Sequence, residues 1–330
     1  MKIVMVGEAA NHQSRLSARL PAGMEFLALP RDAAASDAWD GAIAADDVLI
    51  TLRFSRPAGR SPAVRLLHVP GAGLDGIALD ALHPATTVCN VYEHEIAIAE
   101  YVLLALLDHE IRLADMRARF AALPWADAYR GRVPHGEVHG KRLGLIGLGR
   151  IARAIAARAQ AFGMRVAASD VAGAAIPGLV DEFLPAGRLD ELLAQSDYVV
   201  VACPLTAATR GMLGARQLAA MKPTAVVVNV SRAEIIDEAA LFQALERKAI
   251  GAAVLDVWYR YPAGDADDAA PSRYPFHTLD NAVCTPHSCA WTGQLPERRY
   301  AFIARNIERL LAGEPLQNVV RAPARPRPAP

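Results

Sequence analysis

Residues 143–170 read LGLIGLGRIARAIAARAQAFGMRVAASD. The stretch begins with a short apolar run that is typical of a buried strand, and the glycine turn Gly147-x-Gly149-x-x-Ala152 follows at once. Apolar residues then recur at helical spacing, and a second apolar run ends on Asp170. The order strand, glycine turn, helix, strand and acid predicts a dinucleotide-binding βαβ unit, with an ordinary βα turn as the alternative.

Each marked residue of this unit has a distinct expected task. Gly147 permits the tight turn, Gly149 lets backbone N–H groups approach a pyrophosphate, and the small Ala152 lets helix and strand pack closely. Asp170 would accept the hydroxyls of an adenosine ribose, and its charge would repel a 2′-phosphate. Because no Arg directly follows Asp170, the sequence favours NAD over NADP as the cofactor.

The bulk composition narrows the class of protein. The chain has 330 residues, of which 53% are hydrophobic and 21% are charged, so two domains with sizeable cores are expected. Lys and Arg number 35, as do Asp and Glu, and this balance argues against a nucleic-acid partner or an anionic membrane surface. The apolar start of the chain is too short for a signal peptide, and no apolar run is long enough to span a membrane.

The four cysteines do not show a metal-binding spacing. Cys89 and Cys203 are isolated in the sequence, and Cys284 and Cys289 lie five positions apart without nearby partners. Scattered thiols of this kind are typical of a reducing compartment. We therefore expect a cytoplasmic protein without a bound metal.

Strand-like and helix-like runs alternate along most of the chain, which predicts an α/β fold with parallel sheets. The predicted strands are residues 2–6, 47–52, 66–69, 143–146, 165–170, 198–202, 225–230, 252–255 and 281–284. The predicted helices are residues 96–107, 151–162, 189–193, 213–221, 238–245 and 294–311, of which the first is nearly all apolar and would link two domains. Residues 108–135 are polar and irregular, as in a dimer contact or a plain surface loop. The Pro- and Arg-rich tail, residues 319–330, predicts disorder.

Polar residues follow several predicted strands, at the end where open α/β sheets bind ligands. Arg232 suits a substrate carboxylate through its planar fork, and His287 can exchange a proton near neutral pH. Asp256 could bind a nicotinamide carboxamide and hold Arg232 in place. Singly each residue has a structural interpretation, but together behind a dinucleotide fold they predict a hydride-transfer site. The turn PGAGLDG, residues 70–76, either binds an anion through its N–H groups or is a simple tight turn.

The chain resembles the D-isomer-specific 2-hydroxyacid dehydrogenases over nearly all of residues 1–320. The matching stretches are GAGLDGI (71–77), AIAEYVLLALL (97–107), GKRLGLIGLGRIAR (140–153), LDELLAQSDYVVVACPLTAATRGML (189–213), MKPTAVVVNVSRAEIIDEAAL (221–241), AAVLDV (252–257) and TPHSCAW (285–291). The resemblance implies two Rossmann-like domains with parallel sheets, in a formate/glycerate dehydrogenase-like architecture. Residues 1–95 with 288–318 would form a flavodoxin-like substrate-binding domain, and residues 96–287 the NAD-binding domain. A homodimer is also implied.

The resemblance further implies roles for individual residues. Arg232 would bind the substrate and His287 would act as acid and base, which makes these two the catalytic pair. The N–H groups of Gly71, Ala72 and Gly73 would meet the substrate carboxylate. The residues lining NAD would be Gly147, Gly149, Arg150, Ile151, Asp170, Cys203, Pro204, Thr209, Val230, Asp256 and His287.

The chain departs from the family pattern at Tyr261, which stands where a Glu usually pairs with the catalytic His and holds it protonated. A neutral phenol cannot raise the pKa of an imidazole as a carboxylate does. Either a nearby acid (Asp265, Asp267 or Asp268) substitutes, or His287 works with a lower pKa, or the reaction needs no proton transfer. The last alternative agrees with the stretch DVWYRYP, which also resembles formate dehydrogenases, where a neutral Gln stands at that place.

Two smaller departures affect the same region. Ala233-Glu234 replaces the usual Arg-Gly pair after the substrate-binding Arg. His94 lies roughly where formate dehydrogenases carry a substrate-facing Asn, so it either faces the substrate or is a polar residue at a helix start.

Three functions are therefore considered. The first is an NAD-dependent oxidoreductase that transfers hydride between nicotinamide and C2 of a small D-2-hydroxy or 2-oxo acid, with Arg232 on the carboxylate and His287 as acid/base. The second is a formate- or phosphite-type dehydrogenase, which oxidises a one-centre anion. The third is an NAD(H)-sensing binding protein with weak catalysis, for which the absent Glu is the only support.

Overall fold

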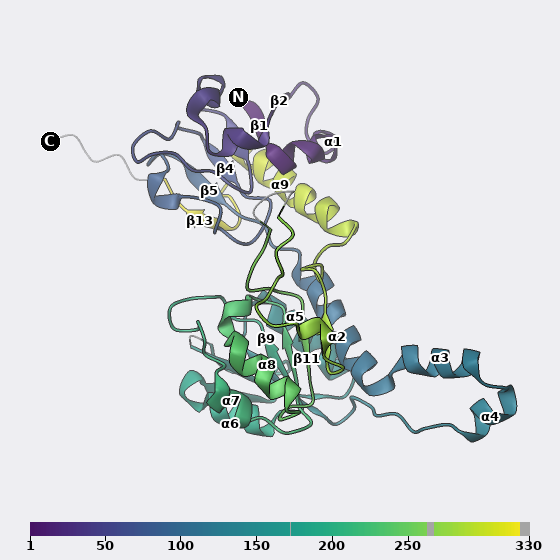
Figure 1. The fold of residues 1–330 in the computed structure, drawn as a ribbon. Coiled ribbons are helices and arrows are strands. Elements are labelled where there is room, and N and C mark those ends of the chain that lie inside the picture. Colours follow the sequence, from purple (N-terminus) through teal and green to yellow (C-terminus); the bar gives the residue numbers. More distant parts are fainter. Residues whose placement is uncertain (172, 263–266, 324–330) are drawn as a thin grey trace. The chain divides into compact units, whose positions relative to one another are not determined.

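The computed structural model describes residues 1–171, 173–262 and 267–323 (Figure 1). The chain divides into two compact units. The first unit comprises Met1–Glu93 and Thr292–Pro330, and the second unit comprises His94–Trp291. The domain limits expected from the sequence, 95/96 and 287/288, lie two and four residues from these junctions.

The first unit is built on a six-stranded sheet with the order β13-β5-β4-β3-β1-β2. Its strands are β1 (Lys2–Val6), β2 (Glu25–Leu29), β3 (Val48–Ile50), β4 (Leu66–His68), β5 (Thr87–Cys89) and β13 (Val319–Arg321). Strands β1 to β5 are parallel, and β13 pairs antiparallel with β5. The order 2-1-3-4-5 of the parallel strands is that of a flavodoxin-like sheet.

Apolar side chains bury both faces of this sheet. Along β1, Ile3 and Met5 belong to one core cluster and Val4 and Val6 to another, as expected when successive side chains point to opposite faces. The first cluster also contains Ile303 of the long C-terminal helix. The helices of this unit are α1 (Gln13–Ser17), α9 (Gln294–Ala312) and short 3-10 helices at Gly7–His12, Arg31–Ala34, Asp37–Ala42 and Leu79–Ala81.

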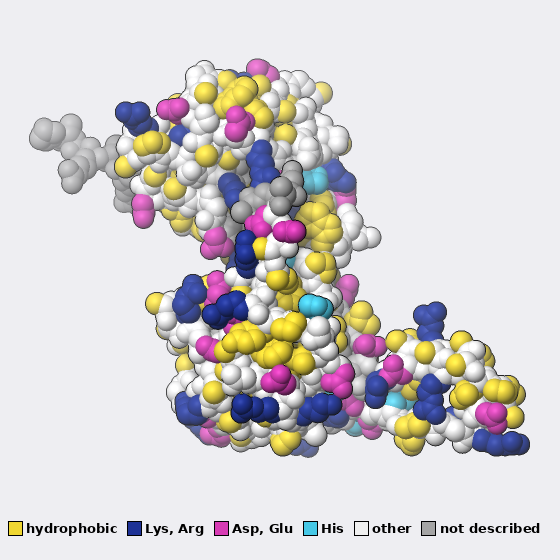
Figure 2. Space-filling view, in the orientation of Figure 1, with side chains coloured by type: hydrophobic (Ala, Val, Ile, Leu, Met, Phe, Trp, Pro, Cys, Tyr) yellow, Lys and Arg dark blue, Asp and Glu magenta, His cyan; other side chains and the backbone are white. Residues whose placement is uncertain are grey.

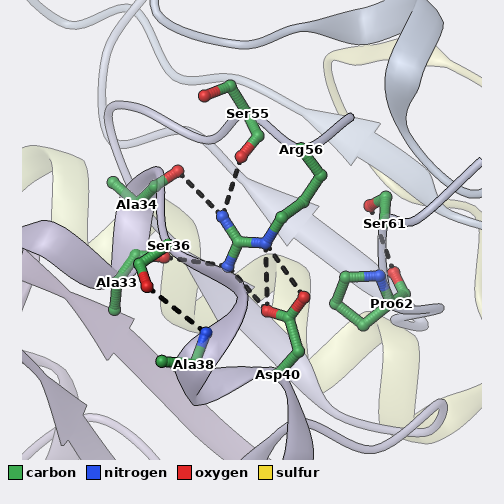
Figure 3. Close-up of polar contacts among 9 residues, drawn as sticks. All are labelled: Ala33, Ala34, Ser36, Ala38, Asp40, Ser55, Arg56, Ser61 and Pro62. Atoms are coloured by element: carbon green, nitrogen blue, oxygen red, sulfur yellow. Dashed lines mark hydrogen bonds and ion pairs between the residues drawn. The ribbon is translucent and has the colours of Figure 1, made fainter. Parts of the chain in front are cut away.

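Arg56 is a buried charge of the first unit, and its hydrogen bonds are all internal. Its guanidinium donates to both carboxylate oxygens of Asp40 and to the backbone oxygens of Ala33, Ala34 and Ser55 (Figure 3). These bonds use all five N–H groups of the side chain, which is 1% exposed. Arg56 therefore fastens the two 3-10 helices beside it and has no donor left for a ligand.

The second unit contains a seven-stranded, fully parallel sheet with the order β12-β11-β10-β9-β6-β7-β8. Its strands are β6 (Arg142–Ile146), β7 (Arg165–Asp170), β8 (Glu182–Pro185), β9 (Tyr198–Val201), β10 (Val226–Asn229), β11 (Ala252–Leu255) and β12 (Ala282–Cys284). In chain order this is the Rossmann arrangement 3-2-1-4-5-6 with one added strand. The order reverses between β6 and β9, where such sheets bind dinucleotides.

Helices cover this sheet on both faces. The helices that pack on it are α2 (Glu95–Ile111), α5 (Arg150–Ala161), α6 (Leu189–Gln195), α7 (Ala215–Ala219) and α8 (Glu238–Glu246), with 3-10 helices at Ala186–Arg188, Ala233–Ile235 and Phe276–Thr278. Helices α3 (Leu113–Ala122) and α4 (Trp125–Arg130) bury no residue and extend away from the sheet (Figure 1). Helices α2 and α5 pack against each other, and α5 can approach closely because it buries Ala152, Ala156 and Ala159.

The structure confirms the predicted α/β fold with parallel sheets. Strands β2, β5 and β8 were not predicted; β5 has three residues, and β2 and β8 do not alternate cleanly between buried and exposed positions. The expectation of an irregular segment at 108–135 was wrong, because α3 and α4 lie within it. The tail was expected to be disordered from residue 319, where the structure has strand β13; residues 324–330 lie outside the described residues.

Candidate active site

Three of the predicted site residues follow neighbouring strands of the second unit. Arg232, Asp256 and His287 come after β10, β11 and β12 in turn. These strands are parallel and in register, with Asn229 opposite Leu255 and Leu255 opposite Cys284. The three side chains therefore arise from one edge of the sheet, at the carboxyl ends of the strands.

Asp256 is fully buried and holds the loop that carries His287. One of its oxygens accepts hydrogen bonds from Thr285 Oγ1 at 2.5 Å and from Ser288 N at 2.8 Å. The other accepts from Cys289 N at 3.0 Å. These three hydrogen bonds from one short segment offset the free energy needed to bury the carboxylate. They also fix the chain on both sides of His287.

His287 has a left-handed backbone conformation, with φ at +56°. Non-glycine residues seldom adopt this region, and those that do are often found at functional sites. Its Nδ1 atom lies 2.8 Å from the hydroxyl of Tyr261. Tyr261 thus contacts His287 from the sequence position where the family's Glu was expected. Of the alternative acids, Asp267 pairs with Arg260 at 3.2 Å, and Asp265 lies outside the described residues.

The electrostatic surroundings favour neutral His287. Removal of its ring from water lowers the pKa of His287; Asp256 opposes this effect, and the positive charge of Arg232 adds to it. Burial raises the pKa of Tyr261, so the phenol keeps its proton at neutral pH. Arg232 itself is anchored through its backbone, because Asn229 Nδ2 donates to Arg232 O at 3.0 Å.

The glycine turn between β6 and α5 has the shape that a pyrophosphate requires. Gly147 has φ at +93°, and a Cβ there would lie 2.8 Å from the backbone N of Cys203. A Cβ at Gly149 would meet no atom within 4 Å, so the space beside the start of α5 is open. Asp170, at the end of β7, accepts a hydrogen bond from Leu148 N at 2.7 Å and so ties the acid to the turn. This arrangement fits a dinucleotide.

The other residues expected to line NAD occupy the loops beside this turn. Thr209 donates to Pro204 O at 2.7 Å and accepts from Thr206 N at 2.8 Å, so its hydroxyl shapes its own loop. Cys203 is buried, and its carbonyl accepts a hydrogen bond from the Ser231 hydroxyl, which joins the loops after β9 and β10. The remaining positions are Val230, which is buried, Ile151, which packs on the core, and Arg150, whose Nη1 lies 3.9 Å from Glu95 Oε1.

The predicted anion-binding turn of the first unit follows β4. Asn90 Nδ2 donates to Ala72 O at 2.9 Å, and Val91 N donates to Gly71 O at 3.2 Å. Within the described ranges, the N–H groups of Gly71, Ala72 and Gly73 donate a hydrogen bond to no protein group. The turn is therefore held through its carbonyls and keeps its donors available for an anion.

The remaining positions are His94, for which the sequence left two interpretations open, and two residues that were not predicted. His94 directly precedes α2, which agrees with its interpretation as a polar residue at a helix start, and its Nδ1 lies 3.8 Å from Glu95 Oε2. Thr285, which donates to Asp256, was not predicted as a site residue. Its position directly after a predicted strand could have indicated it. Asn90 could not have been found in this way, because β5 was not predicted.

No group of His, Cys, Asp and Glu side chains in the described part of the chain could hold a metal ion. A search of the same residues for a helix long and apolar enough to cross a membrane found none.

Comparison with known proteins gives one consistent family. Residues 103–289 match the model of the D-isomer specific 2-hydroxyacid dehydrogenase NAD-binding domain. The chain is 33% identical to a D-3-phosphoglycerate dehydrogenase of Methanocaldococcus jannaschii over 273 residues, which is 81% of this chain and 49% of that protein. It is 34% identical to a glycerate dehydrogenase of Methylorubrum extorquens over 277 residues, covering 79% of this chain and 80% of that protein. The chain thus spans about half the length of the phosphoglycerate dehydrogenases that it matches.

Solved structures agree with these relatives. The D-lactate dehydrogenase of Lactobacillus jensenii, described with NAD+, aligns with a TM-score of 0.75 and 25% identity over 97% of this chain and 100% of that chain. A D-isomer specific 2-hydroxyacid dehydrogenase family protein of Aeromonas salmonicida aligns with a TM-score of 0.77 and 24% identity, covering 97% and 99% of the two chains. The predictions of two Rossmann-like domains and of NAD as cofactor are confirmed.

Proposed function

Because the chain belongs to the D-isomer specific 2-hydroxyacid dehydrogenase family, we propose that it is an NAD-dependent oxidoreductase acting on a small D-2-hydroxy acid or its 2-oxo form. The observation that supports this most directly is the common edge of β10, β11 and β12. It gathers a fixed cation, a buried anchoring carboxylate and a titratable imidazole beside a dinucleotide turn.

Arg232 and His287 divide the work at this edge. Arg232 binds the substrate carboxylate through two parallel N–H groups and polarises the adjacent C2 oxygen. His287 exchanges the proton of that oxygen. Bound NAD supplies the hydride acceptor, or in its reduced form the donor.

The turn of Gly71, Ala72 and Gly73 has a part in the same proposal. Its N–H groups have no protein partner within the described ranges, and Asn90 keeps their backbone in place. Backbone donors of this kind bind a carboxylate without adding a charge. Asn90→Ala should therefore raise KM for the acid more than it lowers kcat, and equal KM values would remove the turn from substrate binding.

The direct test is consumption of NADH with a panel of 2-oxo acids, from glyoxylate and pyruvate to phenylpyruvate, between about pH 5 and pH 9. Turnover of any of them supports the proposal. Absence of turnover on the whole panel, with NADH binding still measurable, would overturn it in favour of a cofactor-sensing protein or a dehydrogenase of a one-centre anion.

One observation favours a second candidate, a formate- or phosphite-type dehydrogenase. The partner of His287 is a neutral phenol, and oxidation of a one-centre anion needs no strong acid or base at this position. Reduction of NAD with formate or phosphite as the only other substrate distinguishes this candidate, because a 2-hydroxyacid dehydrogenase has no C2 oxygen to work on in either anion.

We also propose that α3 and α4 form the contact with a second copy of the chain. Neither helix has a buried residue, and Figure 2 shows apolar side chains along this arm among several Arg side chains. The exposed large apolar residues are Leu113, Met116, Phe120, Leu123, Trp125, Tyr129 and Val133. So much apolar surface on one segment is a typical mark of an interface.

The oligomeric state tests this contact. Sedimentation of the wild type should give a dimer, and Phe120→Asp or Trp125→Asp should give a monomer. Phe162→Asp is the matched control, because Phe162 is equally apolar and 45% exposed but lies outside the arm. A monomeric wild type, or a dimer that survives both arm substitutions, would exclude the arm.

The cysteines agree with a cytoplasmic location, which we include in the proposal. Cys89, Cys203, Cys284 and Cys289 are all free thiols. Burial raises the pKa of Cys203 to about 11 and that of Cys89 to about 12, so these thiols stay protonated and inert. Fractionation of the source cell tests the location.

A further inference from the structure

The hydroxyl of Tyr261 lies between a fixed donor and the imidazole of His287. The backbone N–H of Trp258 donates to the Tyr261 oxygen at 3.1 Å. The same oxygen lies 2.8 Å from His287 Nδ1. No other partner of this hydroxyl exists among the described residues.

The protons at this junction can be assigned from the donors available. A backbone N–H can only donate, so the Tyr261 oxygen accepts from Trp258. The single phenol proton then has one protein acceptor within reach, the lone pair of His287 Nδ1. With Nδ1 as acceptor, the ring proton of neutral imidazole must sit on Nε2. In the opposite tautomer Nδ1–H would donate to Tyr261, and the phenol proton would be left to solvent.

The surrounding loop holds this geometry in place. Trp258 donates from its indole Nε1 to Thr285 O at 2.8 Å, so the segment of Tyr261 is tied to the segment of His287. Asp256 binds the latter segment through three hydrogen bonds. The two rings lie 5.4 Å apart between centroids. Hydrogen bonds therefore hold the backbone segments that carry the two rings.

We propose that Tyr261 is a positioning residue that holds neutral His287 as the Nε2–H tautomer. The family's Glu would do the opposite, because a carboxylate accepts from Nδ1–H and stabilises the doubly protonated ring. In this chain His287 presents a neutral N–H donor on the side of the ring away from Tyr261. The catalytic consequences below rest on the proposed function, whereas the tautomer itself does not.

A proton can pass through this pair without forming an imidazolium. During reduction of a 2-oxo acid, the Nε2–H bond breaks and an O–H bond forms at the C2 oxygen. The Tyr261 O–H proton moves to Nδ1, which restores a neutral ring of the opposite tautomer. Water returns a proton to the Tyr261 oxygen, and Tyr261 is 46% exposed and open to it. After the product leaves, solvent takes the Nδ1 proton and gives one to Nε2, which restores the Nε2–H tautomer. Over the whole cycle the C2 oxygen gains one proton and solvent loses one, so charge balances.

The charged groups that face the pair act in both directions. Arg232 disfavours a proton on the ring and Asp256 favours one. At Tyr261, Arg232 stabilises the phenolate, whereas Asp256 and Glu234 destabilise it. None of the three removes the need for a donor at Nδ1, because each acts at a distance and the Tyr261 hydroxyl is in direct contact.

The tautomer can be measured without cofactor or substrate. Nitrogen NMR of the ¹⁵N-His protein at about pH 7 distinguishes a protonated ring nitrogen from an unprotonated one, and His287→Gln identifies the signal. We expect unprotonated Nδ1 and protonated Nε2 in the wild type. Tyr261→Phe keeps the ring but removes the hydroxyl and should give a mixture of tautomers. A wild type with protonated Nδ1, or Tyr261→Phe with an unchanged signal, would overturn the proposal.

Tyr261→Glu is the complementary variant, because it restores the family's carboxylate. It should move the His287 signals to the doubly protonated form and raise the pH midpoint by about one unit or more. If turnover is found, the rate of 2-oxo acid reduction by the wild type should not change between about pH 6 and pH 8. The rate of the Tyr261→Glu variant should fall at the alkaline end of this range. An equal loss of rate at alkaline pH in both enzymes would show that Tyr261 does not control the protonation of His287. Absence of turnover with the expected tautomer would count against the proposed function alone.

Discussion

His68 should make the first unit lose stability between about pH 6.5 and pH 4. It is fully buried in β4, and its Nε2 atom lies 3.1 Å from Asn306 Nδ2. The amide orientation of Asn306 is fixed by Gln317, whose N–H donates to Asn306 Oδ1 and whose carbonyl accepts from Nδ2. Nε2 must therefore accept, and Nδ1–H donates to Val69 O at 3.3 Å. A second proton on the ring would face the amide N–H directly.

The size of the effect follows from the pKa of the group. Burial lowers the pKa of His68 from 6.5 to about 4. Between these values the unfolded chain binds a proton that the folded unit does not, so stability rises with pH. The contribution is complete above about pH 6.5 and is lost as the pH falls toward 4. A difference of about 2.5 pKa units corresponds to roughly 3 kcal/mol.

Amide hydrogen exchange in β1, β3 and β4 measures this loss within the first unit. Protection should fall steadily from pH 6.5 to pH 4.5 in the wild type, after correction for the intrinsic exchange rate. His68→Phe keeps a ring in the cavity and removes the titration, so its curve should be nearly flat whatever its baseline. His12→Gln is the control, because burial also lowers the pKa of His12. A slope that persists in His68→Phe and disappears in His12→Gln would refute the reasoning.

Four substitutions test the candidate site directly. His287→Ala should lower kcat about 10²- to 10⁴-fold with NAD affinity nearly unchanged in calorimetry; unaltered turnover would remove it from the mechanism. Arg232→Lys should lower kcat/KM at least about tenfold, because an ammonium cannot form the bidentate pair, and an equal kcat/KM would contradict this. Asp170→Ala should narrow the ratio of NAD to NADP affinity by about tenfold, and an unaltered ratio would refute the ribose assignment. Asp256→Ala should lower the free energy of unfolding by roughly 3 kcal/mol even without cofactor, since it leaves buried backbone donors unpaired; a stable variant would show that the loop does not need this anchor.

Local spacing accounts for the parts of the fold that the sequence predicted well. In residues 143–170, the turn, the helix and both strands have sequence signals of their own, and each appears as expected in β6, α5 and β7. Strand β5 has only three residues and depends on its neighbours for register, so periodicity could not detect it. Asn90 was not predicted for the same reason, because a residue at the end of a strand can be recognised only when the strand itself has been predicted.

The arm shows a different limit. Residues 108–135 contain many apolar as well as charged side chains, and the amphipathic pattern that marks a helix packed on its own core is weak there. Helices α3 and α4 have no core to face, since none of their residues is buried. A sequence pattern that reports burial within one chain cannot reveal helices that bury no residue in that chain.

Some residues of the candidate site could likewise be predicted from their local sequence, whereas others depend on contacts made only in the fold. Arg232, Asp256 and His287 were predicted because each follows a strand, and parallel strands deliver their ends to one edge. The replacement of Glu by Tyr261 was also visible in the sequence. The effect of this replacement on His287 was not visible, because it depends on the hydrogen bond that the backbone N–H of Trp258 donates to the Tyr261 oxygen. Every residue except proline has a backbone N–H, so no side-chain pattern can reveal such a donor. The tautomer that we propose for His287 thus depends on a main-chain donor that only the folded geometry identifies.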